Sequence, residues 1–210
     1  TDADRAHVLD LLARRADDPA ALRELTERAA SATVDVRFDV AERLLAARRL
    51  DAALALHEGI LAERPEHAGS LLRVAQLRAW ANDAAGALPY LDRLVGIAPD
   101  GEALYLRGEA HFATQRDAAG RADFERALPL LREESHDDPL RRRMLAAVLA
   151  RRGDVAEACA LFEALAADAP DDLHLLLDYA GAMFVARRLD RAADVLARAA
   201  PLGPDDQRTL

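Results

Sequence analysis

The chain has 210 residues, 51% of them apolar and 31% charged, which is typical of one or two folded domains and not of a disordered chain. Its net charge of −9 disfavours a nucleic-acid binder with a broad basic face, and no apolar run is long enough for a membrane span. The single cysteine excludes an internal disulfide and a cysteine-rich zinc site. Because alanine, leucine, arginine and glutamate are strong helix formers and dominate the composition, we expect an all-α protein.

The amino-terminal residues 1–33 are expected to form two helices, near 4–16 and 20–31, separated by the Asp-Asp-Pro sequence at 17–19. An aspartate before a helix accepts hydrogen bonds from its free N–H groups, and proline is tolerated in the first turn. The small residues of this segment do not follow the spacing of the rest of the chain. We therefore interpret it as a divergent helix hairpin that packs on the first of the repeats that follow.

A period of about 34 residues runs through the remainder of the chain. Pro65 and Pro99 lie 34 residues apart, as do Pro170 and Pro204, and each proline follows an apolar helical pattern that it ends. Small residues repeat in two columns twelve residues apart, with the same spacings of 34, 33, 38 and 34: Ala41, Ala75, Gly108, Ala146 and Ala180, and then Ala53, Ala87, Gly120, Ala158 and Ala192. Small side chains at a fixed period predict helices that approach one another closely, as in an α-solenoid.

Larger side chains occur at the positions where the space between the two helices of a pair has to be filled. They come four residues after the second small column: His57, Leu91, Phe124, Phe162 and Leu196. A further position three residues later completes an i, i+4, i+7 stripe on the second helix of each pair: Ile60, Leu94, Ala127, Leu165 and Ala199.

The sharpest copy of the pattern is RRGDVAEACALFEALAADAPDD, which combines a Gly153–Asp154 turn, the small Ala158, the large Phe162 and the terminating Pro170. This pattern resembles the tetratricopeptide repeat, a 34-residue helix–turn–helix unit. The resemblance implies a right-handed α-solenoid of antiparallel helix pairs. It divides the chain into five repeats and a tail: 34–67, 68–100, 101–138, 139–172, 173–206 and 207–210.

The carboxyl-terminal end departs from the family's pattern. Tetratricopeptide arrays usually finish with an additional polar-faced helix, but only Asp205 to Leu210 remain for one. Three interpretations stay open: a segment of a longer protein, an end covered by another chain, or a last repeat that is polar enough by itself. Self-association through this uncapped repeat is one expected consequence.

No catalytic, cofactor-binding or metal-binding set is recognised in the sequence. The six histidines form no H-x-x-x-H or H-E-x-x-H pair, and neither a Gly-rich phosphate loop nor a G-x-S-x-G elbow occurs. His57 and His111 fall in core columns and are expected to pack. Residues 141–143, all arginine, open a helix against its dipole and form either a solvated face or a contact for an acidic partner. We expect a protein that is not an enzyme.

In the family, the first helix of each repeat lines a concave groove. The resemblance therefore implies a partner-binding groove formed by Asp35, Phe38, Asp39, Glu42, Leu72, Arg73, Gln76, Trp80, Tyr105, Glu109, Phe112, Arg143, Met144 and Phe184. An acidic end and an aromatic middle suit a partner with a basic stretch and an apolar anchor. Each residue of the aromatic middle (Trp80, Tyr105 and Phe112) either contacts that partner or packs between repeats. The Lys, Asn and Arg clamp of the family's chaperone-binding members is absent apart from Arg73.

These features predict a non-catalytic scaffold that binds a peptide or protein partner in the groove, without a cofactor, nucleic acid or membrane span. The alternative is a regulatory or targeting segment of a larger enzyme or of a secretion or assembly machine. Arginine as the only basic residue besides histidine, with abundant alanine, is typical of GC-rich coding and favours a bacterial source. We expect a cytoplasmic location, although a single cysteine is equally compatible with the periplasm.

Overall fold

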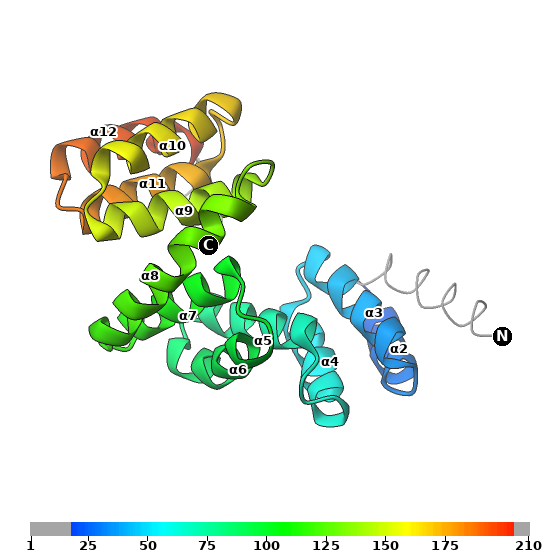
Figure 1. The fold of residues 1–210 in the computed structure, drawn as a ribbon. Helices are drawn as coiled ribbons and strands as arrows, with labels where there is room; N and C mark the ends of the chain where they lie inside the picture. Colours follow the sequence, from blue (N-terminus) through cyan, green and yellow to red (C-terminus); the bar gives the residue numbers. More distant parts are fainter. Residues whose placement is uncertain (1–17, 204–210) are drawn as a thin grey trace. The chain divides into compact units, whose positions relative to one another are not determined.

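A computed structural model describes residues 18–203 of the chain, and this range contains α-helices and one final 3₁₀ turn but no β-strand (Figure 1). The expected all-α class is therefore confirmed for this range. The helix expected near 4–16 lies outside the described residues, whereas the one expected at 20–31 corresponds to α2. The helices are α2 (Pro19–Ala30), α3 (Val34–Ala46), α4 (Leu50–Glu63), α5 (Ala68–Trp80), α6 (Ala84–Ile97), α7 (Gly101–Ala113), α8 (Asp117–Glu134), α9 (Pro139–Arg152), α10 (Val155–Asp168), α11 (Leu173–Val185) and α12 (Leu189–Ala199).

The helices belong to two compact units. Among the described residues, the first contains 18–99 and 109–117, and the second contains 100–108 and 118–203, so α7 contributes to both. In the first unit α3 packs on α4 and α5 on α6, and in the second α9 packs on α10 and α11 on α12. Short turns join the two helices of each pair (Figure 1).

Small residues lie where the helices of a pair meet. All ten positions of the two small-residue columns are buried. At Gly108 a Cβ atom would lie 2.5 Å from Cδ1 of Phe124, so no side chain fits at this position without displacing the ring. The columns thus mark the lines along which helices approach closely, as the sequence predicts.

A residue with left-handed backbone conformation closes the turn inside each helix pair. The positive φ angles lie between 58° and 104°, and the spacing of these residues repeats that of the small columns: Arg48, Asn82, Gln115, Gly153 and Arg187. Glycine adopts this conformation without strain and asparagine with little, whereas arginine and glutamine adopt it at a cost. The predicted turn at Gly153 is confirmed, and the equivalent turns at arginine and glutamine carry no sequence signal.

Substitutions at these turns test the backbone requirement. Gly153→Ala is expected to lower the free energy of unfolding by about 1 kcal/mol, and Gln115→Gly to raise it by up to about 1 kcal/mol, because only the first change adds strain. Urea unfolding followed by circular dichroism measures both. Gly59→Ala is the matched control, since Gly59 is an exposed helical residue with free space around it, and this change should be stabilising. A neutral Gly153→Ala would contradict the account.

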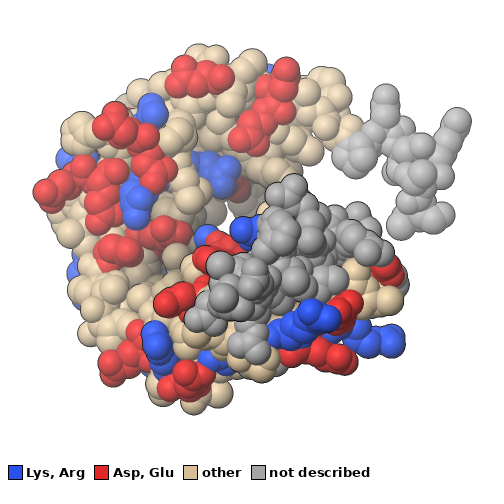
Figure 2. Space-filling view, turned by 90° about the vertical axis from the view of Figure 1, so that its right-hand side faces the viewer, with Lys and Arg blue, Asp and Glu red and all other residues tan. Residues whose placement is uncertain are grey.

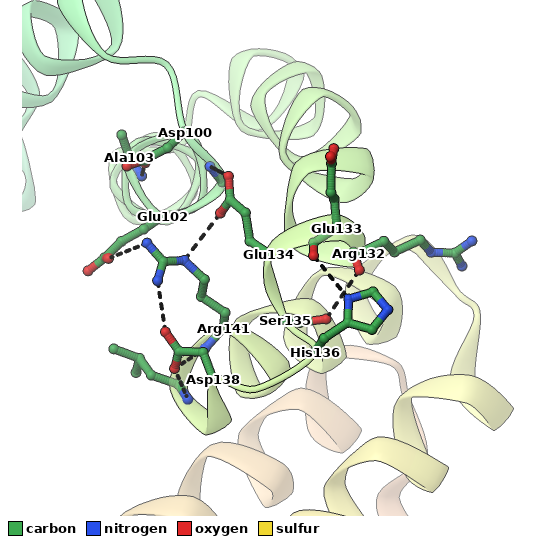
Figure 3. Close-up of polar contacts among 12 residues, drawn as sticks. Asp100, Glu102, Ala103, Arg132, Glu133, Glu134, Ser135, His136, Asp138 and Arg141 are labelled. Atoms are coloured by element: carbon green, nitrogen blue, oxygen red, sulfur yellow. Dashed lines mark hydrogen bonds and ion pairs between the residues drawn. The ribbon is translucent and has the colours of Figure 1, made fainter.

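Asp138 and Arg141 join three helices of the second unit through a charge network. The Asp138 side chain accepts hydrogen bonds from the backbone N–H groups of Leu140 and Arg141 at the start of α9, at 2.8 and 3.3 Å. The Arg141 guanidinium contacts Asp138 at 2.8 Å, Glu134 of α8 at 3.2 Å and Glu102 of α7 at 3.9 Å (Figure 3). Burial opposes ionisation of Asp138, but these hydrogen bonds outweigh it and lower its pKa. The Arg141 guanidinium therefore forms ion pairs with carboxylates of its own chain.

His57 is fully buried among α3, α4 and α5 in the first unit, which confirms that it packs. Its Nδ1 lies 3.2 Å from Oγ of Ser70, and the Phe38 ring meets it edge-on with centroids 5.4 Å apart. Its Nε2 has no hydrogen-bond partner among the described residues and lies 3.6 Å from Oε1 of Glu42. Burial lowers the pKa of His57 from 6.5 to about 4, since the opposing effect of the Glu42 carboxylate is smaller. The imidazole is therefore neutral at neutral pH.

The neutral state of His57 predicts a loss of stability in acid. Between pH 6.5 and about 4 the unfolded chain binds a proton that the folded chain excludes, so the free energy of unfolding falls as the pH falls through this window. The contribution reaches about 3 kcal/mol at the low end. His57→Leu, which places in α4 the residue type found at Leu91 of α6, should remove this component. Urea unfolding at several pH values measures it, and identical pH slopes for the two proteins would contradict it.

Candidate functional site

The acidic residues predicted for the groove lie on one face of α3. Asp35, Asp39 and Glu42 are separated by four and then three residues, so their side chains project in the same direction. Asp35 and Asp39 are exposed, and neither forms an ion pair or hydrogen bond with another described residue. Both carboxylates thus remain open to a ligand from solvent.

A second row of predicted groove residues lies on one face of α5. Arg73, Gln76 and Trp80 follow one another at intervals of three and four residues. The Arg73 guanidinium donates hydrogen bonds to both carboxylate oxygens of Glu42, at 2.8 and 2.7 Å, and a third to Oε1 of Gln76 at 2.9 Å. This bidentate pair holds the two helix faces side by side. We call the resulting surface the α3–α5 face: Asp35, Asp39, Glu42, Arg73, Gln76 and Trp80.

Trp80 is the most distinctive side chain of the α3–α5 face. It is the last residue of α5, the only tryptophan of the chain, and 63% exposed. Tryptophan is normally largely buried, and it is enriched among the residues that dominate binding energies at interfaces. The three carboxylates and one guanidinium give the face a net charge of −2. The α3–α5 face therefore combines an exposed indole at the end of α5 with two open carboxylates on α3.

The other predicted groove residues of the first unit lie partly inside it. Phe38 is half-buried, with its ring 5.4 Å from that of His57 and 5.2 Å from that of His67. A Cβ atom on Gly69 would lie 2.8 Å from the same ring. Phe38 therefore packs between α3 and α5. Leu72 of α5 and two residues of α7 are also half-buried: Glu109 and Phe112.

In the second unit the predicted residues have different environments. Tyr105 is half-buried and stacks on Phe124, with centroids 5.6 Å apart, so it too packs within its unit. Phe184 is 66% exposed, and Arg143 is half-buried with its Nε 3.1 Å from a carboxylate oxygen of Asp178.

Met144 does not present its side chain to a partner, because it is only 6% exposed. Helix α9 packs against both α10 and α11, which covers most of its circumference and buries Met144 together with Leu145 and Val148. The groove prediction is corrected for this residue.

The bidentate Glu42–Arg73 pair was not predicted from the sequence. It joins residues 31 positions apart, so no local sequence pattern indicates it.

The described residues were compared with three other kinds of site: a metal centre, a membrane-spanning helix and a basic surface. No cluster of three or more His, Cys, Asp or Glu side chains suited to a metal ion occurs among them. Within residues 18–203, no helix has the length and hydropathy needed to cross a membrane. On the face of the molecule that Figure 2 shows, arginines lie among carboxylates and the described residues form no broad basic patch.

Comparison with known proteins agrees with this architecture. The sequence model of the tetratricopeptide repeat family matches residues 44–112 and 149–209, which together make up more than half of the chain. A tetratricopeptide repeat protein from Parabacteroides merdae is similar in structure, with a TM-score of 0.60, 20% identity, and 96% of this chain and 81% of that one covered. No curated protein shows significant similarity to the sequence.

Two further solved structures show the same fold. A thermophilic tetratricopeptide repeat protein from Thermus thermophilus has a TM-score of 0.57 and 24% identity, with 83% and 93% of the two chains covered. PilW, described as a widely conserved type IV pilus biogenesis factor, has a TM-score of 0.57 and 16% identity, with 80% and 77% covered. These likenesses confirm the predicted fold class.

Tetratricopeptide repeats form scaffolds for protein–protein interaction, and members of the family bind protein or peptide partners and are generally non-catalytic. The helix pairs of both units, the buried small-residue columns and the family match lead to the same conclusion. The chain belongs to the tetratricopeptide repeat family.

Proposed function

We propose that this protein binds a segment of a partner protein on the α3–α5 face, and that the segment carries basic residues beside an apolar anchor. The observation that carries the proposal is the exposed Trp80 on the same surface as the open carboxylates of Asp35 and Asp39. An indole supplies a large apolar contact area at a low cost in side-chain entropy. The scaffold positions these groups, and no bond is made or broken.

The charges of the face divide into two roles. Glu42 is committed to Arg73, so this pair holds the surface in shape rather than attracting a ligand. Asp35 and Asp39 are exposed and unpaired, and a ligand ammonium or guanidinium group would find them without displacing an internal partner. Exposed charges of this kind act mainly on the association rate and on the choice of partner, and added salt screens them.

The proposal is tested by selecting ligands from a random peptide library displayed on phage. We expect the selected peptides to combine arginine or lysine with a large apolar residue. Their binding should shift the fluorescence of Trp80, which is the only indole in the chain. The double substitution Asp35→Asn/Asp39→Asn should weaken binding about tenfold and reduce its dependence on salt.

The matched control removes the same charge elsewhere in the first unit. Asp51→Asn/Glu66→Gln alters two exposed carboxylates outside the α3–α5 face and should leave the affinity unchanged. Trp80→Ala lacks the indole reporter, so its affinity for the selected peptides is measured by calorimetry. The affinity should fall because the apolar contact is lost. Peptides without basic residues, or equal binding by the two double variants, would overturn the proposal.

A further inference from the structure

Exposed apolar side chains gather on the last helix pair. Within the described part of the chain, eight large apolar side chains are exposed, and five of them belong to α11 and α12. These five are Leu177, Phe184, Val185, Leu189 and Leu196, of which Leu189 is 59% and Leu196 is 48% exposed. A concentration of this kind marks an interaction surface more often than isolated exposed residues do.

Part of this surface is a regular stripe along α12 and the turn that follows it. Leu189, Ala193, Leu196 and Ala200 succeed one another at intervals of four, three and four residues, so they share one side of the helix. All four are exposed. We call this row the α12 stripe. It contains no charged or polar side chain, so covering it would require the desolvation of no ionic group.

The same row on α10 is an interface inside the chain. The equivalent residues, 34 positions earlier, are Val155, Cys159, Phe162 and Ala166, and all four are half-buried or buried. Helix α11 covers them: the Tyr179 ring stacks on Phe162 with centroids 4.8 Å apart, and Sδ of Met183 lies 3.4 Å from Sγ of Cys159. This side of the second helix is therefore built to receive another helix.

Leu196 departs from the expectation that it fills the core like the other members of its column. His57, Leu91, Phe124 and Phe162 are buried, whereas Leu196 is not. The reason is that a later helix lies against α4 and against α10, while no described helix follows α12.

We propose that two copies of this chain dock on each other through the α12 stripe, with the two helices antiparallel. In that alignment Leu189 of one copy faces Ala200 of the other, and Ala193 faces Leu196. Each large side chain thus meets a small one, and the twofold axis makes every contact occur twice. Alternation of large and small residues across a helix pair allows close packing without voids.

Two arginines of α12 do not oppose this arrangement. Arg191 and Arg198 contact Glu163 of α10, at 3.9 and 3.0 Å, and therefore lie on another side of α12. Their guanidinium groups would not be forced together at the twofold axis. A helix pair of about three turns is a small interface, and interfaces of this size hold weak, reversible assemblies.

Analytical ultracentrifugation of the 210-residue chain across micromolar to millimolar concentrations tests the proposal. The apparent mass should rise with concentration towards that of a dimer. Leu196→Glu should raise the dissociation constant at least about tenfold, because it buries a charge opposite Ala193. Ile97→Glu is the matched control, since Ile97 is an exposed apolar residue at the end of α6, and it should leave the dissociation constant unchanged.

A pair of volume changes separates specific docking from general apolar adhesion. Ala193→Leu enlarges the apolar surface but places leucine opposite leucine, so it should weaken the dimer. Adding Leu196→Ala to it exchanges the large and small positions and should restore association. Circular dichroism checks that each variant keeps its helices. A monomer at every concentration, a stronger dimer with Ala193→Leu, or equal effects of Leu196→Glu and Ile97→Glu would overturn the proposal.

Discussion

The close approach of paired helices at small residues is the constraint on which the rest of this structure depends. Ala41, Ala53 and their equivalents are buried, and at Gly108 the neighbouring Phe124 ring leaves no room for a single methyl group. Two helices can approach this closely only where the side chains between them are small. Once that distance is set, the larger residues four positions later have a cavity of defined size to fill, and the turn between the helices must be short. The left-handed residue in each turn is a consequence of this shortness.

The surfaces proposed for binding follow from the same packing. Helix α5 packs on α4, and the pair formed by Glu42 and Arg73 fixes the neighbouring faces of α3 and α5. The next helix packs on α4 and on α10, whereas on α12 Leu189 and Leu196 are exposed. A repeat protein therefore offers two kinds of surface, one along the first helices and one wherever a second helix lacks a neighbour.

Much of this could be predicted from the sequence because periodic packing leaves a periodic signal. The small columns, the turn at Gly153 and the burial of His57 each depend on one residue type at one position of the period. Side chains whose environment depends on non-local neighbours gave no such signal. Met144 is buried because α9 packs against both α10 and α11, Leu196 is exposed because its expected neighbour is missing from the described residues, and the partner of Arg73 is a glutamate on another helix. The extent of the binding surface in the second unit stays a prediction for the same reason.

The small columns, rather than helix propensity, determine how the paired helices pack. The most direct test compares the free energies of unfolding of Ala158→Leu and Ala160→Leu on the same helix, measured by urea titration. Ala158 is completely buried at a helix contact, whereas Ala160 is exposed, and leucine is a good helix former at both positions. Overpacking at Ala158 should cost about 1–3 kcal/mol, while Ala160→Leu should change the stability by less than about 0.5 kcal/mol. Equal effects of the two substitutions would contradict the account.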